Sequence, residues 1–383
     1  MKKKSVNQTY LWPVSDLVYS QNDTIYMIDR NHVYSLSGMS NNLLYTFDEN
    51  TKPVSITGTP RTILYPPVIQ DDTICVVCKD LRQRITKLLY ITQEGKIVRE
   101  ALCEDDFFDV AFCGEYTVFI TKKNSMQFSS KDIFSISWKN EENVAVQSSI
   151  INSTILRVLP LENSLLYVKK EEKQLVLVQA FITGESNDLL SIPINGEEFP
   201  YKDNPMLIKT SKNNIYLISC DWNQYYVAKF GIGLDGVLRC LKRFCICDIG
   251  TAIMVLPCIS NNEKNIIFQE FCFEAVDSLA PKNRIRSLCM ETGEIVTCYE
   301  ETFPKYTPTY SGPVSVNDEV FVTIWGDRNK HRLSVFENGR GLIENRNLNC
   351  ADLFLSRPIY GQSLYVTEVN RVWNDVKISQ LQV

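Results

Sequence analysis

The chain has 383 residues, of which 44% are hydrophobic and 22% are charged, and its formal net charge is −5. This composition is typical of a globular protein and excludes a disordered or fibrous chain. The negative charge argues against a broad electrostatic affinity for nucleic acid or anionic membrane, so neither is expected as a partner.

The N-terminus lacks the pattern of a signal peptide. The basic start Lys2-Lys3-Lys4 is not followed by an apolar run of signal length, and no stretch of about 18 apolar residues occurs in the chain. The 13 cysteines are odd in number and irregularly spaced, which favours reduced, buried thiols over disulfides. We therefore expect a cytoplasmic protein.

A strand-and-turn phrase recurs eight times along the chain. Each copy is a polar turn followed by a short strand core that is mostly aliphatic–aromatic–aliphatic. The central positions of the copies are Tyr26, Cys75, Phe119, Tyr167, Tyr216, Phe268, Phe321 and Tyr365. They lie 44 to 53 residues apart, a period that with several short strands per unit is typical of a β-propeller.

Each unit divides into four expected strands, here named A to D in chain order. A short A segment, often with proline, precedes the phrase, as at residues 64–69, 311–314 and 357–360. The phrase itself is strand B, strand C follows, and a C–D hairpin closes the unit. Most of these hairpins have a glycine in the turn, where a positive φ is required: Gly95, Gly184, Gly236, Gly293 and Gly339.

The last unit predicts how the fold closes. It has A, B and C strands near Ile359, Tyr365 and residues 376–381, but the chain ends at Val383 without a D strand. Roughly residues 3–12 precede the first A strand and have no partner of their own, so we expect them to complete the last blade. The prediction is an all-β, single domain over residues 1–383: an eight-bladed β-propeller of four-stranded antiparallel blades, with seven blades as the alternative.

These repeats resemble those of the PQQ-like and WD-like β-propeller superfamily. The resemblance rests on "Pro-Val" A strands, on "Ile-Tyr-hydrophobic" B strands and on hairpins such as residues 290–296, and it covers almost the whole chain. The superfamily includes quinoprotein dehydrogenases and non-catalytic propeller lipoproteins of outer-membrane assembly. Its enzymes carry tryptophan docking motifs in most blades and a pair of adjacent cysteines. Here there are five tryptophans and no adjacent cysteines, so no redox function or cofactor is expected.

The cysteines and histidines do not predict a metal site. Cys75 and Cys78 form a Cys-x-x-Cys pair, but on a strand positions i and i+3 point to opposite faces. Cys245 and Cys247 share a face, but they lack the paired spacing of a zinc site. His32 and His331, the two histidines, fall in expected B–C loops and are interpreted as solvated loop residues.

One face of the propeller collects residues that favour binding. B–C and D–A loops emerge on the same face of antiparallel blades, and three tryptophans lie at or beside B–C loops. Tryptophan and arginine dominate binding hot spots, although a tryptophan that packs between blades is the alternative. The candidate binding residues are Trp222, Trp325, Asp327, Arg328, Arg371 and Trp373. The longest B–C insertion, residues 274–283, lies in blade 6, between two of the tryptophan blades.

The sequence leaves two functions open. The first is a non-catalytic scaffold that binds a protein or peptide through the B–C/D–A loop face, because no catalytic motif is present. The alternative is a propeller enzyme (a lyase, hydrolase or isomerase) with its site in the central funnel, where a small-molecule ligand would bind. No catalytic residue is identified.

Overall fold

A computed structural model gives the structure of the protein. It describes residues 2–19, 24–37, 40–56, 63–70, 72–103, 106–123, 132–193, 205–210, 212–221, 224–247, 251–273, 282–302, 311–327, 330–348, 352–356, 364–370 and 375–382. The regular elements of these residues are all strands, so none of them forms a helix of the length and hydrophobicity that crossing a membrane requires.

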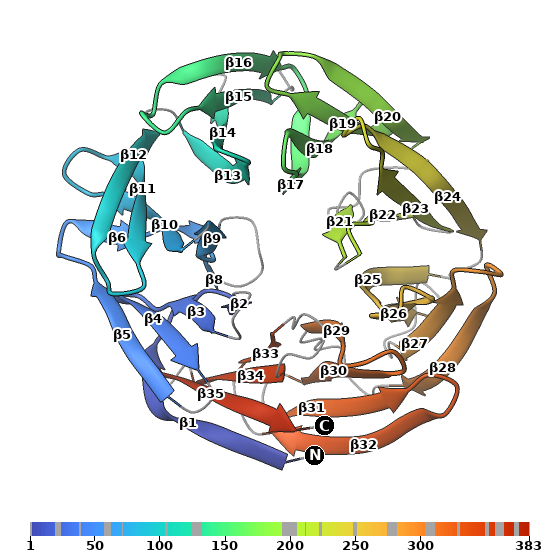
Figure 1. Ribbon diagram of the computed structural model, residues 1–383. Coiled ribbons are helices and arrows are strands. Elements are labelled where there is room, and N and C mark those ends of the chain that lie inside the picture. Colours follow the sequence, from blue (N-terminus) through green and yellow to red (C-terminus); the bar gives the residue numbers. More distant parts are fainter. Residues whose placement is uncertain are drawn as a thin grey trace. The chain divides into compact units, whose positions relative to one another are not determined.

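The fold is an eight-bladed β-propeller with four-stranded antiparallel blades (Figure 1). All eight copies of the repeated phrase lie in the B strands, so the prediction of eight blades rather than seven is confirmed. The B strands are β3 (Ile25–Ile28), β10 (Thr73–Asp80), β14 (Tyr116–Lys123), β18 (Ser164–Glu171), β22 (Ile215–Asp221), β26 (Asn265–Phe273), β30 (Val320–Asp327) and β34 (Leu364–Asn370).

The C and D strands follow the B strands in every blade. The C strands are β4 (His32–Ser37), β11 (Ile85–Thr92), β15 (Ile133–Lys139), β19 (Gln174–Phe181), β23 (Gln224–Ile232), β27 (Lys282–Cys289), β31 (Lys330–Glu337) and β35 (Asp375–Gln382). The D strands are β5 (Ser40–Thr46), β12 (Ile97–Cys103), β16 (Ala145–Ile151), β20 (Ser186–Pro193), β24 (Leu238–Cys247), β28 (Ile295–Thr302), β32 (Gly341–Leu348) and β1 (Lys2–Leu11). The five predicted turn glycines all have positive φ, between 73° and 91°.

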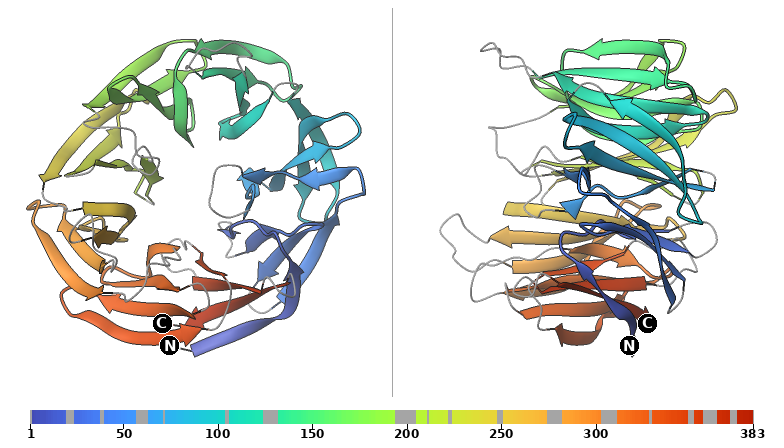
Figure 2. Two further views of the ribbon diagram at one scale, coloured as in Figure 1. Left: turned by 180° about the vertical axis from the view of Figure 1, so that it is seen from behind. Right: turned by 90° about the vertical axis from the view of Figure 1, so that its left-hand side faces the viewer.

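The N-terminal strand closes the last blade, as predicted. Strand β1 pairs antiparallel with β35, from Lys2 opposite Gln382 to Leu11 opposite Asp375. The two strands lie side by side in both views of Figure 2. An edge that would otherwise expose unpaired backbone groups on β35 is thereby covered.

The A strands differ most from the prediction. Most of them are regular: β2 (Val18–Tyr19), β13 (Phe107–Cys113), β17 (Thr154–Pro160), β21 (Met206–Lys209), β25 (Thr251–Ile259), β29 (Ser311–Ser315) and β33 (Asp352–Leu355). In blade 8 the A strand is β33, which precedes the predicted position near Ile359; residues 357–360 lie outside the described residues.

The A position of blade 2 is divided between two segments. β9 (Val68–Gln70) pairs with the start of β10, and β6 (Thr51–Pro53) pairs with its end. Between them the chain forms a second small sheet from β7 (Ser55–Ile56) and β8 (Ile63–Leu64). The predicted segment 64–69 therefore supplies half of the inner strand, because β6 occupies the other half of the ladder.

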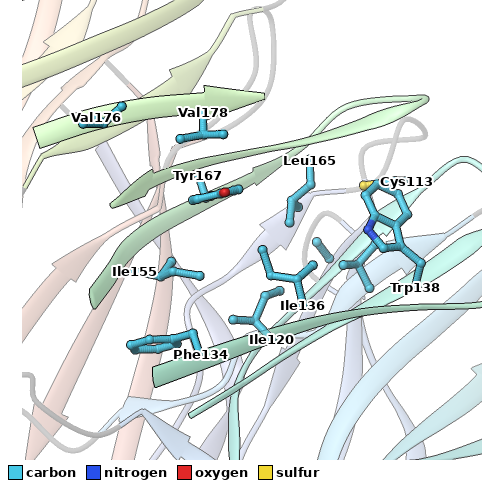
Figure 3. Close-up of a cluster of buried hydrophobic side chains, with 12 residues drawn as sticks. Cys113, Ile120, Phe134, Ile136, Trp138, Ile155, Leu165, Tyr167, Val176 and Val178 are labelled. Atoms are coloured by element: carbon cyan, nitrogen blue, oxygen red, sulfur yellow. The ribbon is translucent and has the colours of Figure 1, made fainter. Parts of the chain in front are cut away.

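By its internal contacts the chain divides into two compact units, Met1–Glu100 with Val255–Val383 and Ala101–Met254. In the second unit the facing sides of blades 3 and 4 form an apolar core. Ile120, Phe134 and Ile136 of blade 3 pack with Ile155 and Tyr167 of blade 4 (Figure 3). Trp138, which is not one of the predicted binding residues, joins this cluster with 2% of its surface exposed.

The first unit has cores of the same kind. One of them joins blade 8 to blade 1 through Tyr10 of β1, whose ring meets Tyr34 edge-on at 5.0 Å. Each fully buried aliphatic or aromatic side chain in such cores contributes about 1.5–3 kcal/mol. The apolar runs of the central strands, buried on both faces in β3, β10 and β18, supply both faces of these blades with apolar residues.

Candidate functional site

Only two of the six predicted binding residues lie among the described residues. Trp222, Arg328, Arg371 and Trp373 lie outside the described residues. Trp325 and Asp327 belong to β30, where the structure describes the backbone and pairs them with Arg332 and Lys330 of β31. The six residues as a set therefore stay a prediction, and the described residues around β30 define the candidate site.

That site is a group of polar residues at the end of blades 6 and 7 where strand B turns into strand C, the B–C end. We call it the blade 6–7 polar cluster. Its members are Gln269, Glu270, Lys282, Asn283, Arg284, Arg286, Glu300, Glu301, Thr323 and Arg332.

One face of blade 6 carries a ladder of alternating charges. The buried carboxylate of Glu270 accepts hydrogen bonds of 2.6 Å from the guanidinium of Arg284, and it lies 3.6 Å from Nη1 of Arg286. Arg284 is the register partner of Glu300, which in turn pairs with Lys282 at 2.8 Å. The ladder runs from the buried Arg286 to the more exposed Lys282 and Glu300 at the rim.

The other face of blade 6 meets blade 7 through neutral and charged hydrogen bonds. Oε1 of Gln269 accepts a 2.5 Å hydrogen bond from the hydroxyl of Thr323, and its Nε2 donates to the carbonyl of Ile324. Nearer the B–C end, Nη1 of Arg332 donates to both carboxylate oxygens of Glu301 at 2.8 Å. These contacts fix the end of β31 against β28.

Two members of the cluster have polar atoms that are not used. Asn283 is completely buried, and neither its amide nitrogen nor its amide oxygen has a hydrogen-bond partner. Nε and Nη1 of Arg286, 7% exposed, also lack a hydrogen bond. An unpaired buried polar atom costs about 1–3 kcal/mol, so the cluster is not optimised for stability alone.

The sequence contains a pattern that predicts this cluster, although the strand-and-turn repeat does not include it. Residues 282–286 read Lys-Asn-Arg-Ile-Arg, with a cation at every second position, and Glu270 and Glu300 stand on the flanking strands. Opposite charges on one face of neighbouring strands attract each other. Pairing the charges of adjacent strands would therefore have identified the ladder.

Of the two histidines that were predicted to be solvated loop residues, only His331 is fully buried. His32 begins β4, a quarter exposed, and its Nδ1 lies 3.1 Å from the buried carboxylate of Asp29. His331 is fully buried, which contradicts the interpretation as a solvated loop residue. The reason is that β30 and β31 extend to Asp327 and Lys330, so His331 is a strand residue, paired with Gly326 and Leu348.

The cysteines follow the strand argument. Cys75 and Cys78 lie in β10, both buried, and only Cys78 belongs to the apolar core shared with blade 1, as expected for residues on opposite faces. Burial raises the pKa of the Cys78 thiol far above its usual range. In the part of the chain that the structure describes, no three His, Cys, Asp or Glu residues are grouped so that they could hold a metal ion.

The A strands of blades 3 and 4 offer a second group of polar residues. Asp109 and Arg157 each follow a β-bulge, in β13 and β17. Burial lowers the pKa of Arg157, while the nearby carboxylate of Asp109 opposes that shift. Bulges redirect side chains and occur often beside active sites.

No family model matches the chain, and no curated protein sequence matches it. Similar solved structures include BamB from Moraxella catarrhalis, which is 12% identical with a TM-score of 0.55 over 99% of this chain and 100% of that chain. The WD40 domain of SCAP from fission yeast is 10% identical, with a TM-score of 0.45 over 85% of this chain and 84% of that chain. The periplasmic gluconolactonase PpgL of Pseudomonas aeruginosa is 11% identical, with a TM-score of 0.45 over 89% and 96%.

The match to BamB spans the chain and reflects a shared fold, whereas the two weaker matches carry no argument. An identity of 12% says nothing about function. The match to BamB therefore agrees with the predicted β-propeller fold.

Proposed function

We propose that this propeller is a non-catalytic scaffold that binds a protein or peptide through its B–C and D–A loops. The observation that carries the proposal is the position of Arg332. The Arg332 side chain is partly exposed at the B–C end of blade 7, and Glu301 holds its guanidinium in place. On the neighbouring strand, Arg332 pairs in register with Trp325. A tryptophan position and an oriented arginine therefore occupy adjacent strands at the end where the sequence predicts the binding surface.

Tryptophan and arginine are the residue types that contribute most to protein–protein hot spots, because they combine a large apolar area with directed hydrogen bonds. The predicted contact residues Trp222, Trp325, Asp327, Arg328, Arg371 and Trp373 complete this surface in the proposal. The resemblance to a superfamily with non-catalytic members agrees with it.

The test compares two double variants of the immobilised protein in capture from a cell lysate, read by quantitative mass spectrometry. Trp325→Ala with Arg328→Ala alters the B–C loop of blade 7. Leu234→Ala with Arg340→Ala alters exposed residues of the C–D turns, at the opposite end of their blades. We expect partners captured by the wild type to be lost from the first variant and kept by the second. Equal capture by both variants would contradict the proposal.

An enzyme with its site in the central funnel is the second candidate, and the pair Asp109 and Arg157 favours it. A carboxylate and a guanidinium on neighbouring A strands could bind and polarise a small polar substrate. The test is a thermal-shift screen with small carboxylic acids and sugar acids. A stabilising ligand whose effect disappears in both Asp109→Asn and Arg157→Gln would support this candidate, and the absence of such a ligand would count against it.

A further inference from the structure

The guanidinium of Arg332 is only partly used. Its Nη1 donates both hydrogen bonds to Glu301, and among the described residues its Nε and Nη2 have no partner. The side chains of Arg332 and Glu301 are 35% and 26% exposed, so a ligand from solvent can reach them.

The unused edge has a defined chemistry. Nε and Nη2 of an arginine point two parallel N–H groups in one direction, which matches the two oxygens of a carboxylate. Glu301 holds the guanidinium in place before a ligand arrives, which reduces the side-chain entropy lost on binding.

The free edge of Arg332 presents N–H donors alone, so it favours an anion over a cation. Glu301 lies on the face of blade 6 that meets Arg332, whereas Lys282, Arg284 and Arg286 belong to the charge ladder on the other face. Glu301, beside that edge, would repel a doubly charged phosphate more strongly than a single carboxylate.

Asn283 adds unused hydrogen-bonding groups on the same face of blade 6. It is the register partner of Glu301, so the two side chains leave the same face of blade 6. Its buried amide has an unused donor and an unused acceptor beside the ion pair. The polar end of blade 6 therefore has more hydrogen-bonding groups than its own residues satisfy.

We propose that Arg332 is the anchor for a carboxylate of an acidic peptide segment, which binds at the B–C end of blades 6 and 7. This inference rests on the proposed scaffold function and names the chemistry of its partner. The segment supplies an aspartate or glutamate side chain to the Nε–Nη2 edge, while Glu301 stays on Nη1.

The experiment measures fluorescence anisotropy with a labelled, C-terminally amidated peptide of seven glutamates and with the corresponding peptide of seven glutamines. We expect the glutamate peptide to bind at least about tenfold more tightly, with an affinity that falls as salt is added. Arg332→Gln should weaken its binding by about tenfold or more. Arg332→Lys should give an intermediate loss, because the charge remains but the paired donors do not.

Arg340→Gln is the matched control. It removes the same charge from the same blade at the C–D turn, where Arg340 is 78% exposed and pairs with Glu337. We expect it to bind like the wild type, and melting curves establish that each variant is folded. If Arg332→Gln does not fold, Arg332→Lys carries the comparison.

Equal binding of the two peptides, equal binding by Arg332→Gln and Arg340→Gln, or full displacement of the glutamate peptide by an equal concentration of inorganic phosphate would overturn the inference. The lysate capture with the Trp325 and Arg328 variants is a separate readout. If the Trp325 and Arg328 variant loses its captured partners but one of these peptide results occurs, the proposed scaffold function is supported. Only the proposal of an acidic peptide partner is then wrong.

Discussion

At the scale of single residues, the same amino acid has opposite chemistry in different positions. Cys78 is buried in the middle of a strand, where its pKa is raised. Cys289 ends β27 at a C–D turn, where hydrogen bonds from the Thr292 hydroxyl and from the backbone N–H groups of Thr292 and Glu291 lower its pKa. A lower pKa gives more thiolate, the nucleophilic form, at neutral pH.

We therefore predict that Cys289 reacts with iodoacetamide at a lower pH than an unperturbed thiol, and that Cys78 reacts only after unfolding. The labelling rate of Cys289, followed by mass spectrometry from pH 6 to pH 10, should have a midpoint below that of a free cysteine. Thr292→Val should move this midpoint upwards, because it removes a donor to the thiolate. A midpoint that is the same in both proteins would show that the turn does not tune this thiol.

Substitution by alanine should destabilise the protein to different extents at two of the turn glycines, Gly95 and Gly236. Both have positive φ, which costs an alanine about 1–2 kcal/mol. A Cβ at Gly236 would meet nothing within 4 Å, whereas a Cβ at Gly95 would lie 2.0 Å from the carbonyl oxygen of Leu44. Gly95→Ala should therefore lower the free energy of unfolding clearly more than Gly236→Ala, as measured by urea denaturation. Equal losses would mean that the β5 backbone yields without cost.

At the scale of elements, the N-terminal strand β1 covers the edge of β35 and also contributes Tyr10 to an apolar core. Tyr10 packs in the core between blades 8 and 1, but its buried hydroxyl has no hydrogen-bond partner. Tyr10→Phe should leave the stability within about 1 kcal/mol of the wild type or raise it, since an unpaired buried hydroxyl is removed. Tyr10→Ala should cost about 3–5 kcal/mol through the cavity it creates. Thermal melts of both variants test this, and a strongly destabilised Tyr10→Phe would contradict it.

Some strands and turns of this fold could be predicted from the sequence and others could not. The B strands and the C–D turns were predictable, because aliphatic–aromatic cores and positive-φ glycines are local signals. The split between β6 and β9 was not, because it depends on which segment reaches each half of β10. The candidate site was predictable only in part. Trp325 lies on β30 opposite Arg332, whereas the position of the Arg332 guanidinium depends on Glu301 from a neighbouring blade.

At the scale of the whole molecule, we propose that residues 1–383 form one domain. The division into two compact units falls inside strands β12 and β25, and domain boundaries normally fall in exposed linkers. The 383-residue chain should accordingly unfold in a single calorimetric transition. Two separate transitions would identify the units as independent domains.

Closure gives a second prediction at this scale. Removal of residues 2–11 deletes β1 and exposes the edge of β35, so we expect a lower melting temperature and self-association in size-exclusion chromatography. Removal of residues 2–4 is the control, because it leaves the pairs from Thr9 to Leu11 in place. A monomeric, equally stable protein after the longer deletion would show that the β1–β35 ladder is dispensable.

The β1–β35 ladder also has a consequence for biosynthesis. The ribosome makes β1 before every other strand of the propeller and β35 after them, so β1 must wait for the rest of the propeller before its partner exists. Contacts between residues so distant in sequence form slowly, because a long loop has to be closed. Completion of the last blade is therefore the last step in assembling the propeller, and until it occurs the nascent chain carries β1 without its partner strand.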